Sequence, residues 1–408
     1  MSKIKNIAFL FLLIGVVIVS GCVNNQVSTG NSVASEQSTQ SNSETTNQQT
    51  TKDSASSIKN TEMLQTTNPI KVSLKENEIW SSYLYGNYFA FSNERNQKDV
   101  YLYDIINQKL EQITKDLSDQ EIVDISNNKI LYKDYRFVTN RGSEQPLYAL
   151  YDITSKATEN LEINKSLDSN EKISKAVGLT KDFAVFIIYS ETLNESFYPP
   201  GRIYNIKFII YNLDKKTIEK FQIELSNSLS YVYKSSFILD KDSNKILSYF
   251  LNESSNSYEI KIYNIENKKL EKAISFPKTY AANTKEDFFL NNNKIVYSDN
   301  RDGKDNYDIF LYDLTNDRET QITNTADILE KQPSIYDNII VYRKLKPNQD
   351  SNLMKLGIFD ISSNKEIEIA NDCHYFHPQI YGKNIIWQGW DSCSSSWPLS
   401  AVALSKIK

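Results

Sequence analysis

The sequence of this chain argues against most metal sites and most histidine-dependent reactions, because its 408 residues include three cysteines and two histidines. Four of these five lie near the C-terminus: Cys373, His374, His377 and Cys393. Cys-His-Xaa-Xaa-His is not a usual zinc spacing, and adjacent Cys and His side chains rarely converge on one ion. In an oxidising compartment the cysteines would pair instead, closing a loop of roughly 20 residues worth about 3 kcal/mol. We therefore favour a Cys373–Cys393 disulfide over a metal site, with His377 structural at a strand start.

A second candidate is the acidic run Asp299, Asp302, Asp305 and Asp308, whose carboxylates suit calcium. The run lacks the alternating spacing and the terminal Glu of an EF-hand loop. A solvated hairpin turn explains it better, so we predict no metal and no cofactor.

Signature motifs of several enzyme classes are missing from the sequence. It contains no Gly-Xaa-Ser-Xaa-Gly elbow, no His-Glu-Xaa-Xaa-His and no glycine loop that could cradle a phosphate. From these absences we predict that the chain is not an enzyme.

The N-terminus has the pattern of a secretory signal peptide. Lys3 and Lys5 precede an apolar run over residues 7–19, which is too short for a comfortable membrane span. The four residues that follow, Val-Ser-Gly-Cys at 19–22, resemble the lipobox of prokaryotic lipoproteins. The resemblance implies a signal peptide over 1–21, lipidation of Cys22 and a mature protein anchored on the outer face of the cell membrane. An ordinary signal peptide with an incidental cysteine is the alternative.

Residues 22–68 form a predicted tether, because Ser, Thr, Asn and Gln dominate their composition. Such a segment cannot bury enough apolar surface to offset its ordering entropy, so we expect it to be disordered. A flexible coil of this length spans roughly 35–40 Å and would hold a domain away from the membrane.

The composition and charge of the chain favour strands and argue against one class of partner. The sequence contains 26 Tyr, a residue type that suits the half-buried surface of a sheet. Its net charge is -5, and no basic stripe is present to contact phosphates, so we expect no binding to nucleic acid.

An internal repeat with a period of roughly 50 residues determines the expected architecture. In each copy a β-type string ends with an aromatic residue followed by Asp or Asn. An Asn-, Asp- or Gly-rich turn and an apolar strand precede the string, and a second turn and an alternating strand follow it. Four-strand units with this period are typical of β-propeller blades. The six aromatic positions are Tyr103, Tyr151, Tyr211, Tyr263, Tyr312 and Phe359.

One unit resembles a known family. Its segments Ser-Asp-Asn-Arg-Asp-Gly (298–303), Asp-Ile-Phe-Leu-Tyr-Asp-Leu (308–314) and Arg-Glu-Thr-Gln-Ile-Thr (318–323) are similar to the PD40-type repeat of TolB-like propellers. The resemblance extends over about residues 79–390 and implies a propeller fold and a binding role. The family's Trp-Ser-Pro-Asp-Gly turn is missing here, so the partners of TolB itself are not implied.

The repeat also predicts how the ring closes. A seventh unit begins at Cys373 and has strands near 376–381, 384–390 and 399–404, but no outer strand. Residues 69–74 alternate as an outer strand should, with Ile70, Val72 and Leu74 on one face that we expect to be buried. We therefore predict one domain over 69–408: an all-β, seven-bladed propeller of four-stranded antiparallel blades, closed by the N-terminal strand so that no sheet edge stays exposed.

The function expected from this architecture is recognition without catalysis of a protein or an envelope polymer at the cell surface, by a monomer. In propellers the loops between second and third strands share one face, and Tyr, Trp and Arg supply much of the recognition energy at interfaces. An alternative is a carbohydrate-active enzyme, a glycosidase or lyase, with an acidic pocket on the propeller axis and two carboxylates about 5–10 Å apart. The candidate binding residues are Tyr135, Arg136, Arg141, Phe197, Tyr198, Arg202, Arg343, Trp390 and Trp397.

Overall fold

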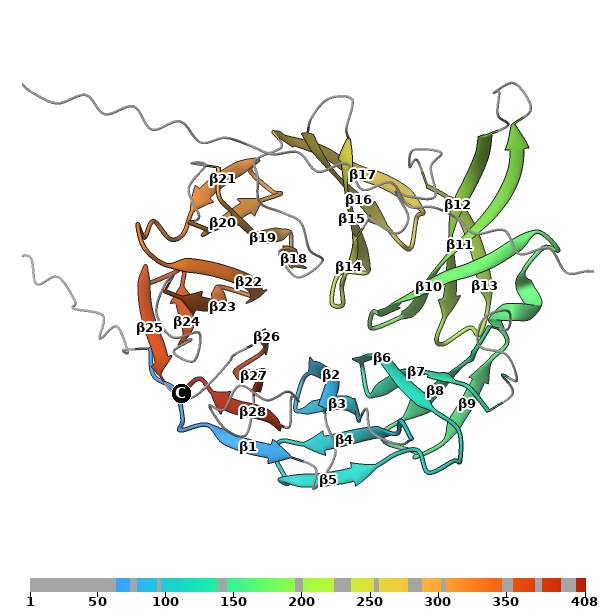
Figure 1. The fold of residues 1–408 in the computed structure, drawn as a ribbon, viewed down its shortest axis with the longest axis horizontal. Coiled ribbons are helices and arrows are strands. Elements are labelled where there is room, and N and C mark those ends of the chain that lie inside the picture. The colour runs from blue at the N-terminus through green and yellow to red at the C-terminus, as the bar shows by residue number, and fades with distance from the viewer. Residues whose placement is uncertain are drawn as a thin grey trace, which may run out of the picture. The chain divides into compact units, whose positions relative to one another are not determined.

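Seven antiparallel sheets of four strands surround a central axis (Figure 1). The fold comes from a computed structural model, which describes residues 64–73, 79–93, 97–136, 138, 145–194, 201–223, 236–252, 257–277, 288–301, 306–346, 355–370, 376–389 and 401–408. The fold is therefore a seven-bladed β-propeller, as the repeat predicted. Within these ranges no helix combines the length and the apolar character needed to cross a membrane.

The first strand of each blade is the innermost, and the fourth is the outermost. Blade 1 contains β2 (Ile79–Tyr85), β3 (Tyr88–Asn93), β4 (Val100–Asp104) and β5 (Lys109–Gln112). Blade 2 contains β6 (Gln120–Ser126), β7 (Lys129–Asp134), β8 (Leu147–Asp152) and β9 (Thr158–Leu161), followed by a 3-10 turn, η1 (Ile163–Ser166). Blade 3 contains β10 (Glu171–Leu179), β11 (Phe183–Asn194), β12 (Gly201–Asn212) and β13 (Ile218–Gln222). Blade 4 contains β14 (Ser236–Asp240), β15 (Lys245–Asn252), β16 (Ser257–Asn264) and β17 (Lys269–Pro277).

The remaining blades follow the same order until the last. Blade 5 contains β18 (Phe288–Asn291), β19 (Lys294–Asp299), β20 (Asp308–Asp313) and β21 (Arg318–Gln321). Blade 6 contains β22 (Leu329–Tyr336), β23 (Ile339–Leu345), β24 (Lys355–Asp360) and β25 (Lys365–Ala370). Blade 7 contains β26 (Phe376–Tyr381), β27 (Asn384–Gly389) and β28 (Ala401–Lys406), and its outer strand is β1 (Ile70–Ser73).

The N-terminal strand closes the ring by pairing with the last strand of the chain, which confirms the predicted closure. Val72 lies opposite Val402 in the β1–β28 register and is buried. The pairing begins before the expected residue 69, because the backbone N–H of Thr67 donates to the carbonyl of Lys406 at 2.8 Å. Ile70 is 43% exposed rather than buried, since the outermost strand lies where neighbouring blades diverge. Leu74 lies outside the described residues.

Each pair of neighbouring blades shares its own apolar core, so the domain has seven cores arranged in a ring. Between blades 7 and 1, for example, Val72, Ile386 and Val402 pack against Phe89 and Phe91. Every blade is consequently stabilised by two neighbours, and the closing strand contributes directly to the last interface.

The Asp or Asn that follows each repeated aromatic residue forms the turn between the third and fourth strands. Asp104 Oδ1 accepts the backbone N–H groups of Ile106 and Asn107 at 2.9 and 3.0 Å, and Asn212 Oδ1 accepts those of Asp214 and Lys215 at 3.1 and 2.8 Å. Short Asx side chains satisfy turn N–H groups in this way, which explains why the repeat requires Asp or Asn there.

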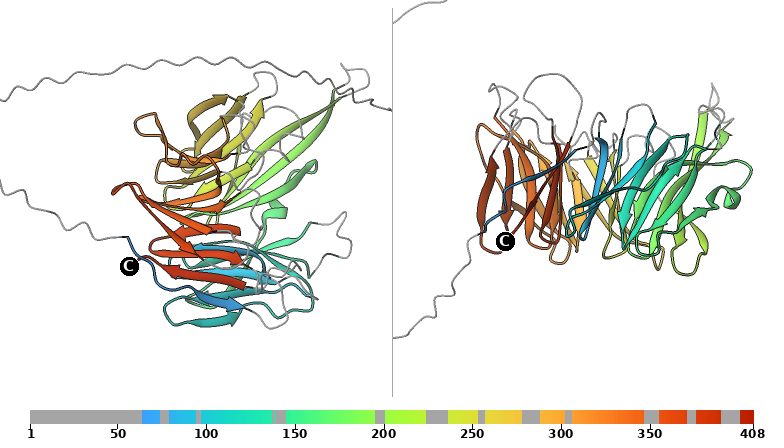
Figure 2. Two further views of the ribbon diagram at one scale, coloured as in Figure 1. Left: turned by 60° about the vertical axis from the view of Figure 1, so that its left-hand side comes forward. Right: turned by 90° about the horizontal axis from the view of Figure 1, so that it is seen from below.

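The antiparallel order gives the propeller two different faces (Figure 2). On the turn face, short turns join first to second strands and third to fourth strands. On the loop face lie the ends of the second strands, the starts of the third strands and the starts of the innermost strands.

Candidate functional site

An axial cavity of about 210 Å³ lies where the innermost strands of all seven blades converge. Its described lining is mainly apolar and aromatic, with a few polar side chains among these groups. Apolar pockets with a small number of convergent polar groups are the usual form of a ligand site. The lining residues used below are Tyr83, Asp124, Lys241, Tyr336, His377 and Tyr381.

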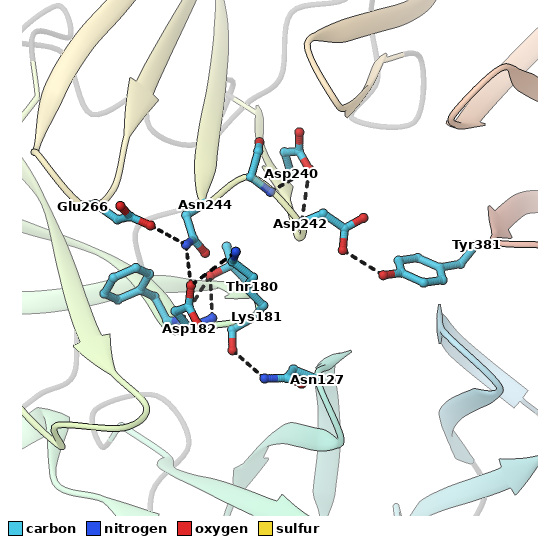
Figure 3. Close-up of polar contacts among 11 residues, drawn as sticks. Asn127, Thr180, Lys181, Asp182, Asp240, Asp242, Asn244, Glu266 and Tyr381 are labelled. Atoms are coloured by element: carbon cyan, nitrogen blue, oxygen red, sulfur yellow. Dashed lines mark hydrogen bonds and ion pairs between the residues drawn. The ribbon is translucent and has the colours of Figure 1, made fainter.

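The turn of blade 4 reaches across the axis at the turn face (Figure 3). The corresponding hairpins of the other blades turn through two residues, for example between Ser126 and Lys129, whereas four residues separate Asp240 from Lys245. Asp242 of the longer turn accepts a hydrogen bond from the Tyr381 hydroxyl of blade 7 at 2.7 Å.

A second contact of the same turn reaches blade 2. Lys241 Nζ lies 2.5 Å from Asp124 Oδ1 and donates to the carbonyl of Ile125 at 2.8 Å. Asp124 Oδ2 accepts the backbone N–H of Leu179 in blade 3 at 2.9 Å. The turn of blade 4 therefore ties blades 2, 3, 4 and 7 together at the turn face.

Two tyrosines, Tyr336 and Tyr381, line the cavity beside these contacts, and the ring of Tyr85 packs against Tyr381. The ring centroids of Tyr85 and Tyr381 are 4.3 Å apart, and those of Tyr336 and Tyr381 are 4.5 Å apart. Burial, together with the neighbouring Tyr85 and Asp242, raises the pKa of Tyr381. Burial also raises the pKa of Tyr336, so the phenols of Tyr336 and Tyr381 stay neutral near pH 7 and act as hydrogen-bonding groups.

Irregularities in the innermost strands shape the cavity wall. The register shifts within β2, β6, β10, β22 and β26, and the φ angles of Gln332 and His377 are 56° and 50°. Bulges of this kind redirect side chains. The left-handed backbone conformation costs free energy for residues other than glycine. Gln332 Oε1 accepts the backbone N–H of His377 at 3.3 Å, so a side chain of blade 6 holds the bulge of blade 7.

The structure places part of the predicted binding face at the loop face. Tyr135 and Arg136 follow directly after β7, and Arg343 lies near the end of β23. Arg136 Nη2 is 2.6 Å from the buried Asp134 and its Nη1 is 3.4 Å from Asp116, so its guanidinium is held by blade 2 and by the segment that joins blade 1 to blade 2.

The remaining predicted binding residues are not placed. The backbone of Arg202 belongs to β12, but its side chain is not described. Five others lie outside the described residues: Arg141, Phe197, Tyr198, Trp390 and Trp397.

The residues considered for disulfide, metal and lipid chemistry are mostly outside the described ranges. Cys22, Cys373, Cys393 and His374 all lie there, so the predicted disulfide and lipid anchor stay predictions. His377 is the second residue of β26 and lines the axial cavity.

Asp302 and Asp305 of the acidic run also fall outside the described part of the chain, which elsewhere contains no group of three metal-ligating side chains. Asp299 and Asp308 are described, and they are buried rather than solvated as a hairpin turn would require. Arg301 contacts Asp299 at 2.9 Å, and Gln321 donates to Asp308 at 3.2 Å. Both carboxylates therefore organise blade 5.

Sequence reasoning missed Lys241, Asp242 and Asp124, which define the turn-face end of the cavity. The one available signal was the length of the blade 4 turn. It identifies an unusual hairpin, but it does not show that the hairpin points across the axis.

Comparisons with known proteins support the fold. No protein-family model and no curated protein sequence matches the chain, so the TolB-like assignment stays a prediction. Among solved structures, the β-propeller domain of the Trilobed protease from Pyrococcus furiosus is 12% identical, with a TM-score of 0.51 over 81% of this chain and 94% of that one. Oligogalacturonate lyase from Vibrio parahaemolyticus is 9% identical, with a TM-score of 0.54 over 85% and 98%.

A further similar structure is longer than this chain. Acylaminoacyl peptidase from Pyrococcus horikoshii is 12% identical, with a TM-score of 0.53 over 77% of this chain. The match covers 49% of the peptidase, so this chain corresponds to about half of it.

These neighbours correct the prediction that the chain is not an enzyme. That prediction is contradicted, because the similar propellers belong to peptidases and a lyase. The prediction relied on the absence of a few enzyme signature motifs. Because catalytic sites are assembled from residues placed on a fold, the absence of those motifs says little about catalysis. At this identity the comparisons establish the propeller alone.

Proposed function

We propose that this protein is a lipid-anchored extracytoplasmic propeller that binds a protein or an envelope polymer at its loop face, with one group of the ligand in the axial cavity. The observation that carries the proposal is the cavity itself, to which all seven innermost strands contribute. Its volume is smaller than the roughly 300–1,000 Å³ of pockets that enclose a whole small molecule. It suits one side chain or one sugar unit of a larger ligand.

Two features favour entry from the loop face. At the turn face, the bonds Asp242–Tyr381 and Lys241–Asp124 cross the end of the cavity. At the loop face, Tyr135 and Arg343 lie near the ends of second strands, and residues of these types supply much of the energy at interfaces.

The carbohydrate-active alternative requires two carboxylates about 5–10 Å apart. Among the described residues that line the axial cavity, Asp124 is the one carboxylate. Lys241 and the Leu179 amide already hold both of its oxygens. The described lining therefore does not supply the pair of carboxylates that a glycosidase needs.

The anchor rests on the lipobox-like residues that end at Cys22. We expect Cys22→Ser to move the mature protein from the membrane fraction to the soluble fraction, or to leave the precursor unprocessed. Fractionation and intact-mass measurement check this. A processed variant that still sediments with membranes would exclude Cys22 as the anchor.

The binding face can be tested with one substitution on each face. We expect Tyr135→Ala to weaken capture of envelope material about 5- to 30-fold, since interface aromatics are frequent hot spots. Ile106→Ala is the control, because Ile106 is 66% exposed in a turn-face turn. Quantitative capture on the immobilised full chain, with melting temperatures for both variants, provides the measurement. Loss of capture with Ile106→Ala alone would place the ligand on the wrong face for this proposal.

A further inference from the structure

A second cavity, of about 220 Å³, lies between blades 1 and 2. Its polar lining combines Ser81, Ser92 and Asn93 with the charged side chains Lys98, Glu121 and Lys133. Tyr83 of β2 lines both this cavity and the axial cavity. The two cavities are therefore neighbours on one inner strand.

The charges in this inter-blade pocket converge on one carboxylate. Lys98 Nζ donates to Glu121 Oε1 at 2.9 Å, Lys133 Nζ lies 3.5 Å from Oε2, and the Tyr135 hydroxyl donates to Oε2 at 3.1 Å. Burial opposes ionisation of Glu121, but the bond from Lys98 and the charge of Lys133 lower its pKa overall. Glu121 is thus an anion near neutral pH.

The described lining consequently carries two ammonium groups and one carboxylate, an excess of one positive charge. The side chains of Lys98, Glu121 and Lys133 are 23%, 26% and 33% exposed, so they can be reached from solvent. Each ammonium has three N–H donors, more than its single contact with Glu121 uses. A ligand group with one negative charge would neutralise the excess and accept those donors.

We propose that the inter-blade pocket binds a monoanionic group, a carboxylate or a phosphodiester, of the ligand whose neighbouring unit enters the axial cavity. This inference rests on the proposed function, because it assigns charge to the same ligand. A phosphodiester and a uronic acid carboxylate share the chemistry that the two lysines recognise. An anionic envelope polymer of either kind fits the site.

The inference can be tested by measuring the affinity of the full chain, in detergent, for three oligomers of equal length. These are a uronic acid oligosaccharide, a glycerol phosphate oligomer and a neutral glucose oligosaccharide. We expect one or both anionic oligomers to bind more tightly than the neutral one, and the tighter of them identifies the source of the anion. We also expect Lys133→Met to weaken that binding about tenfold, as loss of a charged hydrogen bond should. Lys133→Arg, which keeps the charge, should retain most of the affinity.

Lys129→Met is the matched control. Lys129 occupies the other end of β7 and forms a comparable ion pair with Asp152 at 2.8 Å, far from the pocket. This variant should leave the affinity unchanged.

Glu121→Gln separates a binding role from a purely structural ion network. Removing the carboxylate leaves two positive charges in the pocket, so affinity for the anionic oligomer should rise severalfold and fall with added salt. A structural network predicts lower stability and no gain of affinity.

Binding of all three oligomers with equal affinity, or of none, would overturn the inference. So would a Lys133→Met chain with wild-type affinity. If capture of envelope material still depended on Tyr135 in that case, ligand binding at the loop face would be supported. Binding of an anionic group in the inter-blade pocket would be excluded.

Discussion

Deleting residues 64–73 should cost several kcal/mol of unfolding free energy, a large share of the 5–15 kcal/mol typical of a domain. The deletion removes the buried Val72, worth roughly 1.5–3 kcal/mol, and all four β1–β28 residue pairs. It also uncovers Val402 and Leu404 and leaves β28 as an unpaired edge, so association between molecules should follow. Melting temperature and urea midpoint, with light scattering, measure both effects.

Deletion of residues 30–60 is the control, since it shortens the predicted tether and leaves the closing strand in place. Val72→Ala is a milder variant, with an expected loss of about 1–3 kcal/mol, should the first deletion prevent folding. Equal melting temperatures for the two deletions would mean that β1 does not hold the ring together.

Glu171→Gln should lower stability at pH 7 by about 3 kcal/mol, because it breaks a buried ion pair. Glu171 contacts Lys207 at 2.8 Å and also Lys220. Burial opposes its ionisation, but the bonds from these two lysines outweigh burial and lower its pKa to about 2. A depressed pKa gives stability that is complete above the unfolded value near 4.5 and is lost as pH falls towards 2. The difference between variant and wild type in urea denaturation should shrink correspondingly below pH 4.

Glu330→Gln should have the opposite effect and raise the stability of the protein above pH 7. Burial raises the pKa of Glu330 to about 7, against the effects of Thr323 and Lys344, whose Nζ lies 3.8 Å away. A raised pKa means that the wild type is most stable below pH 4.5 and loses stability as pH rises through 7. The variant should match the wild type near pH 4 and exceed it at pH 8 by about 3 kcal/mol. Identical pH profiles for the two proteins would show that Glu330 does not titrate in this range.

The fold could be predicted because its determinants repeat along the chain. Each third strand carries the aromatic residue and the Asp or Asn that forms the next turn, so six copies reinforce one interpretation. The closing strand was predictable from counting, since the seventh unit lacked an outer strand. The burial of Ile70 was predicted wrongly, because alternation reports which residues share a face and not how closely the next blade approaches.

The axial site was not predictable from the repeat, because it is built from departures from it. The four-residue turn after Asp240 reads as an ordinary polar turn, yet it carries Lys241 and Asp242 across the axis. The partners of these residues, Asp124 and Tyr381, are 117 and 139 positions away in the sequence. These residues meet because the seven blades are arranged around one axis. The spacing of residues within a single repeat does not show which blades face each other across that axis.

Hydrogen exchange on the full chain, with and without captured envelope material, tests most directly where the ligand binds. We predict protection at the loop-face ends of the innermost strands, in 79–82, 120–122, 329–332 and 376–378, and no change at the turn-face turns 127–128, 292–293 and 337–338. Protection confined to those turns, with unchanged exchange at the loop-face ends, would contradict it.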